Sequence, residues 1–142
     1  MLAPIEVHKA YKVQLYPNAQ QEELLRKQIG CNRFVHNQML AACQKLRDTG
    51  NLVPSPYELV KSLAKNKEKY PFLCEVDSDA LQKAALDLGA AYTNFFKSLA
   101  GKRKGPKLEA PRFKKRSNSG SFRIENKNRV SLKNNTLTAG KH

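Results

Sequence analysis

The chain has 142 residues, a hydrophobic share of 40% and a formal net charge of +14. This length is enough to bury a hydrophobic core in one domain or in two small lobes. The apolar stretches are shorter than the roughly 18–20 residues of a membrane span, and the first residues lack the basic and apolar regions of a secretory signal. We therefore expect neither a membrane-spanning nor a secreted protein, and no membrane partner.

The positive charge is concentrated in the last third of the chain. Residues 101–142 hold thirteen Lys and Arg against two Asp and Glu, whereas residues 51–100 hold six of each kind. This distribution is typical of a protein that binds the phosphate backbone of a nucleic acid. A solvated basic tail, or a face directed at an acidic protein or lipid, is the alternative interpretation.

In chain order, the first predicted element is a strand at residues 9–16. Tyr11, Val13 and Leu15 alternate there with polar residues, as in a half-buried strand. Asn18 is a good N-cap for a helix at about 19–48. Gly30 lies inside this helix, which predicts either close packing at that point or a break between two shorter helices. The apolar stripe of the helix is predicted to contain Leu24, Leu25, Ile29, Val35, Met39, Cys43 and Leu46.

Two further helices are predicted in the middle of the chain. Residues 48–56 are expected to form a loop, and a shorter helix at about 56–67 should follow it. Asp77 or Ser78 would then cap a third helix at 79–99, whose apolar positions are spaced by threes and fours. We expect this helix, about 31 Å long, to pack against the first.

The pattern changes after the third helix. Residues 101–112 are rich in Gly, Pro and cations, which indicates a loop. Short alternating segments at 121–126, 128–133 and 136–140 predict strands, with hairpin turns at 127–128 and 134–135. The order of strand, helical block and strands predicts an α+β fold, in which a helical unit is inserted in a small β unit.

The sequence offers no catalytic or metal site. His8 and His36 fall outside any zinc-binding spacing, so we interpret them as surface or capping residues. Helix capping explains the two nearby carboxylates of Asp77 and Asp79. The phosphate-binding loop motif does not occur. We therefore predict no catalytic residue, no metal and no cofactor.

The three cysteines, Cys31, Cys43 and Cys74, are odd in number and form no CxxC pair. This usage fits the reduced thiols of a cytosol, and we expect a cytoplasmic protein. All three lie on or beside apolar positions. That placement favours buried hydrophobic roles over reactive thiols.

The candidate binding site is the basic C-terminal region. Flexible cations can follow a phosphate track, and an aromatic ring such as Phe113 or Phe122 can stack on an exposed base. Phe122 alternates with a charged neighbour, which favours a core position for its ring. Charge does not distinguish DNA from RNA. The candidate cations are Lys102, Arg103, Lys104, Lys107, Arg112, Lys114, Lys115, Arg116, Arg123, Lys127, Arg129 and Lys133.

Three blocks of the sequence together resemble one protein family. They read "KVQLYPNAQQEELLRKQIGCNRFVHNQML", "YPFLCEVDSDALQKAALDLGAAYTNFFK" and "GPKLEAPRFKKRSNSGSFRIEN". In these blocks the chain resembles the N-terminal part of the TnpB (OrfB-type) insertion-sequence proteins, over about residues 9–133. That family consists of RNA-guided DNA endonucleases related to type V CRISPR effectors.

The resemblance implies a helical recognition lobe at 18–100, inserted in a partial β-barrel wedge domain. The first wedge strand would lie within 1–17, and the basic loop and remaining wedge strands within 101–142. The RuvC-like nuclease domain of the family lies beyond this region. We therefore expect a fragment truncated before the nuclease, which contacts guide RNA and target-adjacent DNA without cleaving. The missing nuclease part or a full-length paralogue is a further candidate partner.

The resemblance also indicates positions that read the DNA motif beside the target. Gln82 and Asn128 can each pair with an adenine edge. Leu52, Pro56 and Asp79 lack the same donors, so the motif that is read would differ or be lost. The matched positions are Leu52, Pro56, Ser78, Asp79, Gln82, Lys127 and Asn128.

Two other functions stay open. One is a truncated regulatory protein that competes with a full-length nuclease for RNA or DNA. The other is a stand-alone helix-turn-helix DNA-binding protein. It would need a recognition helix rich in exposed polar residues, and the third helix offers Gln82, Lys83, Asn94 and Lys97.

Overall fold

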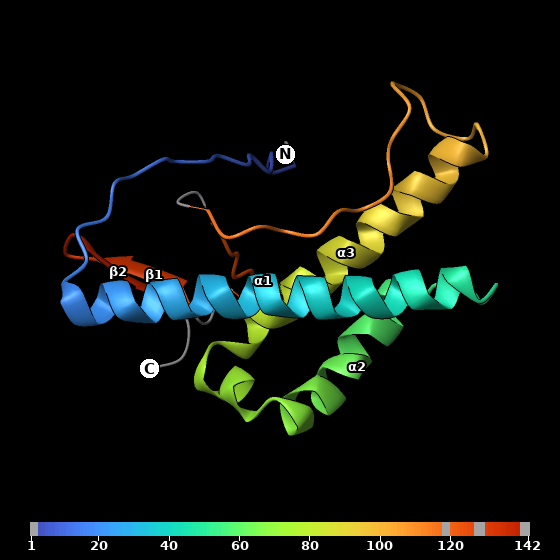
Figure 1. Cartoon of the computed structure of the whole chain (residues 1–142). Coiled ribbons are helices and arrows are strands. Elements are labelled where there is room, and N and C mark those ends of the chain that lie inside the picture. The colour runs from blue at the N-terminus through green and yellow to red at the C-terminus, as the bar shows by residue number, and fades with distance from the viewer. Residues whose placement is uncertain (1–2, 118–119, 127–129, 140–142) are drawn as a thin grey trace.

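Three helices form the body of the molecule (Figure 1). The computed structural model describes residues 3–117, 120–126 and 130–139. α1 spans Ala19–Asp48, α2 spans Pro56–Lys69 and α3 spans Ser78–Leu99, and a short 3-10 helix, η1, lies at Pro71–Glu75. α3 packs against both α1 and α2, so it is the central helix of the three. The three predicted helices and the packing of the third on the first are confirmed.

Local capping sets where the helices begin. Asn18 Oδ1 accepts the backbone amide of Gln21 at 2.9 Å, and the Gln21 side chain accepts the amide of Asn18 at the same distance. These reciprocal bonds satisfy two amides that a first helical turn leaves without helical partners. Ser55 and Asp77 cap α2 and α3 by accepting amides of the first turn.

The hydrophobic core lies where α1 and α2 meet α3. Burial at spacings of three and four along α3 produces a continuous apolar stripe against both neighbours. In the described part of the chain, no helix is both long and apolar enough to cross a membrane. The core consists of Cys31, Val35, Met39, Leu40, Cys43, Leu59, Leu63, Leu73, Leu81, Ala85, Leu88, Tyr92 and Phe95.

Two helical glycines have contrasting surroundings. Gly89 of α3 lies against Pro56, and a Cβ added at residue 89 would lie 2.6 Å from Pro56 Cα. The missing side chain therefore sets how closely the start of α2 approaches α3. At Gly30 the predicted close packing or helix break is wrong. α1 runs through this residue without interruption, and an added Cβ would meet the Arg33 guanidinium at 3.9 Å.

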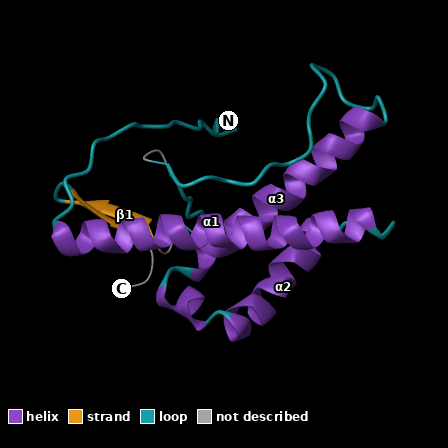
Figure 2. Cartoon of the chain, in the orientation of Figure 1, coloured by secondary structure: helices purple, strands orange, loops and turns teal. Residues whose placement is uncertain are grey.

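The sheet is smaller than predicted. β1 (Val130–Lys133) and β2 (Thr136–Ala139) form an antiparallel hairpin (Figure 2). At its turn, Asn134 and Asn135 have φ of 50° and 61°, positive values that Asn tolerates better than most residues. The turn predicted at 134–135 is confirmed. The turn predicted at 127–128 lies outside the described residues.

Two predicted strands, at 9–16 and 121–126, are wrong, because both segments are loops. Residues 9–16 are exposed, and no described strand lies beside them to complete their backbone hydrogen bonds. At 125 and 126 the backbone amides donate instead to the Asp79 carboxylate. The described residues thus show an α+β fold with a two-stranded sheet, and not the partial barrel that was expected.

The cysteines divide into two kinds. Cys31 and Cys43 are buried as predicted, and burial raises the pKa of both thiols. Cys74 is exposed, so its predicted burial is wrong. It lies in η1, whose short turn directs the neighbouring Leu73 into the core instead.

Candidate nucleic-acid interface

The basic region after α3 lies back along the helices as an extended segment, which we call the strap (residues 108–117 and 120–126). In Figure 1 it returns, in orange, from the C-terminal end of α3. It begins where the Leu108 amide donates to Ser98 Oγ at 2.9 Å, near the end of α3. It ends where two backbone amides donate to Asp79 Oδ2, in the first turn of α3. The strap therefore spans the length of α3 in reverse.

α1 holds the middle of the strap through backbone atoms. His36 Nε2 lies 2.9 Å from the carbonyl oxygen of Arg112. Asn37 makes two bonds to Lys114: its Nδ2 donates to the carbonyl oxygen at 2.9 Å, and its Oδ1 accepts the amide at 2.8 Å. The Asn37 side chain thus satisfies the Lys114 backbone as a neighbouring strand would. Because these bonds use the backbone, residues 112–116 remain exposed.

Acidic side chains offset part of the charge of the strap. Arg123 makes ion pairs with Asp87 of α3 at 2.6 Å and with Glu125 at 2.8 Å. Arg112 pairs with Glu109 inside the strap. Exposed ion pairs such as these contribute about 0–1 kcal/mol, so either arginine can exchange its carboxylate for a phosphate at little cost. Residues 110–124 contain no acidic residue at all.

The helix surface that positions these segments is a polar row on α1. Gln28, Asn32 and His36 follow one another at a spacing of four, and each is at most 8% exposed. Gln28 Oε1 accepts the Asp77 amide at 2.7 Å, and Asn32 Nδ2 donates to the Ala80 carbonyl at 3.0 Å. The row therefore fixes the start of α3 as well as the strap. The interpretation of His36 as a surface or capping residue is wrong, because its ring is buried.

Sequence reasoning missed this row and its neighbour Asn37 because it followed the apolar stripe of the first helix. Buried polar side chains nearly always have hydrogen-bond partners. A run of polar residues at i, i+4 and i+8 beside an apolar stripe is the signal that points to such partners. The pattern does not say that the partners are backbone groups 48 to 76 residues away.

Burial lowers the pKa of His36 from its ordinary value of 6.5; the Arg112 carbonyl opposes this shift, and the charge of Lys114 adds to it. Between the lowered value and 6.5, the unfolded chain binds more protons than the folded chain. The contribution of His36 to stability is therefore fully present above pH 6.5. It is lost as the pH falls through the pKa that His36 has in the folded chain. We expect the urea midpoint of unfolding to be lower at about pH 5 than at about pH 7.5.

The variant His36→Gln should flatten this pH dependence, because an amide can donate to the Arg112 carbonyl but does not titrate. His8→Gln is the matched control, since His8 is exposed in the N-terminal loop. The urea midpoint of the His8→Gln variant should change with pH as that of the parent chain does. If His36→Gln also keeps the full pH dependence, other groups cause it.

The basic loop (residues 101–107) lies at the opposite end of α3 from Ser78 and Gln82. Its base is held by the bond between Ser98 and Leu108. It lies at the C-terminal end of α3 (Figure 1), about 33 Å along the helix axis from the first turn. The structure therefore does not bring these cations near Gln82. The exposed cations of the basic loop are Lys102, Arg103, Lys104 and Lys107.

At the other end of α3, the strap lies close to predicted readers. The Ser78 hydroxyl accepts a bond from Lys67 of α2, and the Asp79 carboxylate is bonded to the strap. Gln82, one turn later, is exposed. Of these three side chains, Gln82 is the most accessible to a duplex.

Two of the remaining predicted readers lie at or just before the start of α2. Pro56 packs against Gly89 of α3, and Leu52 is 93% exposed in the loop before α2. Lys127, Asn128 and Arg129 lie outside the described residues.

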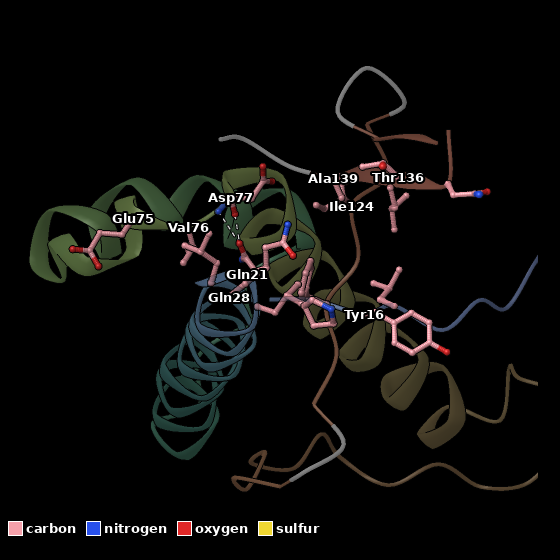
Figure 3. Close-up of a pocket in the computed structure, with 16 residues that line it drawn as sticks. Tyr16, Gln21, Gln28, Glu75, Val76, Asp77, Ile124, Thr136 and Ala139 are labelled. Atoms are coloured by element: carbon pink, nitrogen blue, oxygen red, sulfur yellow. Dashed lines mark hydrogen bonds between the residues drawn. The ribbon is translucent and has the colours of Figure 1, made fainter. Parts of the chain in front are cut away.

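A cavity of about 600 Å³ lies beside the start of α1 (Figure 3). Its wall includes the ends of the segments for which strands were predicted, among them Tyr16, Ile124 and Thr136. Phe122, which was expected in the core, is half-buried in this wall. Two polar groups of the wall, Gln28 and Asp77, are bonded to each other. The described residues contain no group of three or more His, Cys, Asp or Glu that could hold a metal ion.

Comparison with known proteins gives one family match and several relatives. Residues 1–51 match the family model HTH_OrfB_IS605, described as a helix-turn-helix domain. An Escherichia coli (strain K12) protein designated an RNA-guided DNA endonuclease, InsQ, is 36% identical over 118 residues, which are 81% of this chain and 27% of that protein. A Streptomyces pristinaespiralis protein of the same designation is 30% identical over 140 residues, 96% of this chain and 32% of that protein.

A third relative is similar in size to this chain. The virulence protein VsdF of Salmonella dublin is 32% identical over 119 residues, which are 76% of this chain and 93% of VsdF. The chain thus spans about a quarter to a third of the two endonuclease relatives and nearly all of VsdF. Within the residues that match the family model, the structure has one continuous helix, α1, and the second helix follows at α2.

Proposed function

Because this chain belongs to the OrfB-type family of insertion-sequence proteins, we propose that it is a nucleic-acid-binding unit associated with a transposable element. In this proposal the strap and the basic loop contact the backbones of a guide RNA and of the DNA beside its target, and the chain itself does not cleave. Two relatives are named as RNA-guided DNA endonucleases, and the chain matches 27% and 32% of them. We assign nucleic-acid binding to the part of these relatives that the chain matches, and cleavage to the rest of their length.

The observation that carries the proposal is the backbone clamp on the strap. His36 and Asn37 hold the chain extended at 112–114, while the cations of residues 112–116 stay exposed. Side chains on one face of an extended chain recur about every 7 Å. The clamp therefore presents a row of cations at fixed intervals, whereas a disordered basic tail would have to be ordered on binding at a cost in entropy.

The test is a salt titration of the whole chain against a structured RNA hairpin, a single-stranded DNA and a duplex DNA. If about six phosphates are contacted, log affinity should fall with log salt at a slope of about −4 to −5. Fluorescence anisotropy of labelled probes measures both the affinity and the slope. Binding that is absent at low salt, or a slope near zero, would overturn the proposal.

The size of VsdF favours a second candidate function. A relative that this chain covers over 93% of its length suggests that a unit of this size acts alone. Such a unit would compete with a full-length relative for RNA or DNA. Adding the chain in excess to a full-length relative and its guide RNA should then reduce target cleavage, and cleavage that is unaffected would exclude competition.

Replacing Gln82 tests whether the chain reads a duplex motif. Gln82→Ala should spare the general affinity and remove a preference for one base pair, worth about 1–3 kcal/mol, since Gln pairs with an adenine edge in the major groove. Binding to a panel of duplexes that differ at single positions measures this preference. Asn94→Ala, also exposed on α3 and three turns further on, is the control and should leave the preference intact. Equal preferences in all three chains would exclude Gln82 as a reader.

A further inference from the structure

Phe113 lies in the middle of the clamped part of the strap, and 49% of its surface is exposed. Its two neighbours are both fixed through the backbone, Arg112 by His36 and Lys114 by Asn37. The backbone on each side of the ring is therefore held in place by hydrogen bonds that do not involve the ring. This arrangement limits the orientations that the ring can adopt before any ligand arrives.

The surroundings of Phe113 differ from those of the other aromatic residue of the strap. Phe122 is half-buried in the wall of the cavity beside α1. Phe113 instead lies within residues 112–116, where the other four residues are all cations. An exposed aromatic face beside cations is the combination that binds unpaired bases, because the ring stacks on the base while the cations neutralise the phosphates.

We propose that Phe113 is a stacking platform for an unpaired base of single-stranded RNA or DNA, with Lys114, Lys115 and Arg116 on the adjoining phosphates. The inference rests on the proposed function, since the strap must bind nucleic acid for the ring to meet a base. It adds a preference for single strands, because the bases of a duplex already stack on one another. It also assigns the base contact to Phe113 rather than to Phe122.

Replacing the ring tests the stacking directly. Phe113→Ala should weaken the binding of a short oligo(dT) or oligo(U) about 5- to 150-fold, the range that alanine substitution gives for one stacked base. Binding of an abasic oligonucleotide of equal length should be unchanged, since it offers the same phosphates without bases. The slope of log affinity against log salt should also be unchanged, because no cation is removed.

A matched control is available on α2. Tyr57 is 66% exposed, and its ring lies 4.7 Å from Lys61 Nζ, so it is also an exposed ring beside a cation. Tyr57→Ala should bind every probe as the parent chain does. Phe113→Leu keeps apolar bulk without an aromatic face, and it should bind oligo(dT) as weakly as Phe113→Ala. Full affinity in Phe113→Leu would show that the ring acts by apolar packing and would overturn the stacking role.

The absence of tryptophan from the sequence allows a second readout. Phe113→Trp introduces a single indole at the proposed platform, and its emission should be quenched on saturation with oligo(dT) but not with the abasic probe. Tyr57→Trp should show no quenching with either probe. Circular dichroism of each variant checks that the helices are retained.

The two proposals fail in different ways. If the parent chain binds oligo(dT) but Phe113→Ala binds it equally well and the introduced indole is not quenched, the platform is excluded while the proposed function stands. If the parent chain binds none of the probes at low salt, the proposed function fails and the platform fails with it.

Discussion

Replacing Lys114, Lys115 and Arg116 together with alanine should weaken binding to every nucleic acid about a hundredfold at about 0.1 M salt. Each cation that contacts a phosphate releases counterions, so the loss of three contacts should flatten the salt slope by about 2 to 3. The fold should be retained, because Asn37 bonds to the amide and carbonyl of residue 114, which alanine keeps. Salt titrations of the variant and the parent chain measure both effects.

A control with the same loss of charge is offered by α2. Lys61, Lys65 and Lys69 are exposed at a spacing of four, and α2 lies on the other side of α1 from the strap in Figure 1. Replacing these three with alanine should change affinity and slope far less. An equal loss in both triple variants would mean that net charge, and not the strap, determines binding. A strap variant that binds as the parent does at all salt concentrations would make the basic segment a solvated tail.

The variant Gly89→Ala should lower the free energy of unfolding by up to about 2 kcal/mol. The new Cβ would lie 2.6 Å from Pro56 Cα and 2.7 Å from two atoms of its ring, and neither backbone nor ring can rotate away. Overpacking of this kind costs about 1–3 kcal/mol and sometimes more, which exceeds the gain of about 1 kcal/mol in helix propensity. Urea denaturation followed by circular dichroism measures the change.

Gly30→Ala is the control for the same chemical change in an open position. An alanine there meets the Arg33 guanidinium at 3.9 Å, an ordinary contact distance. It should raise the free energy of unfolding by up to about 1 kcal/mol, through helix propensity alone. The two variants should therefore shift stability in opposite directions. A loss at both positions would mean that α1 does not tolerate substitution where the structure shows space.

The helices were predictable because their determinants are local. Asn18 and its partner Gln21 are three residues apart, and the apolar stripe of α3 is legible in a window of twenty residues. The hairpin turn was predictable for the same reason, since Asn134 and Asn135 suit positive φ regardless of their surroundings. Family resemblance identified the class of protein, and the comparisons confirm it.

The path of the strap was not predictable, because it depends on contacts between distant residues. The bond from His36 joins residues 76 positions apart, and Asp79 reaches amides 46 and 47 positions away. Alternation at 121–126 suggested a strand, but alternation states only that one face is apolar. The face at Phe122 lines a cavity, and the Asp79 carboxylate takes the place of a partner strand.

Because α1 holds the strap by its backbone, the position of the strap does not depend on which side chains the strap carries. His36 and Asn37 recognise a carbonyl and an amide, which every residue except proline can offer in full. Substitutions at residues 112–116 can therefore change the charge or the aromatic character of the strap without changing the path of its backbone. Proline at 114 is the exception, since it removes the amide that Asn37 accepts. We expect that many substitutions at residues 112–116 alter the nucleic-acid preference and keep the fold, whereas few substitutions of His36 or Asn37 are tolerated.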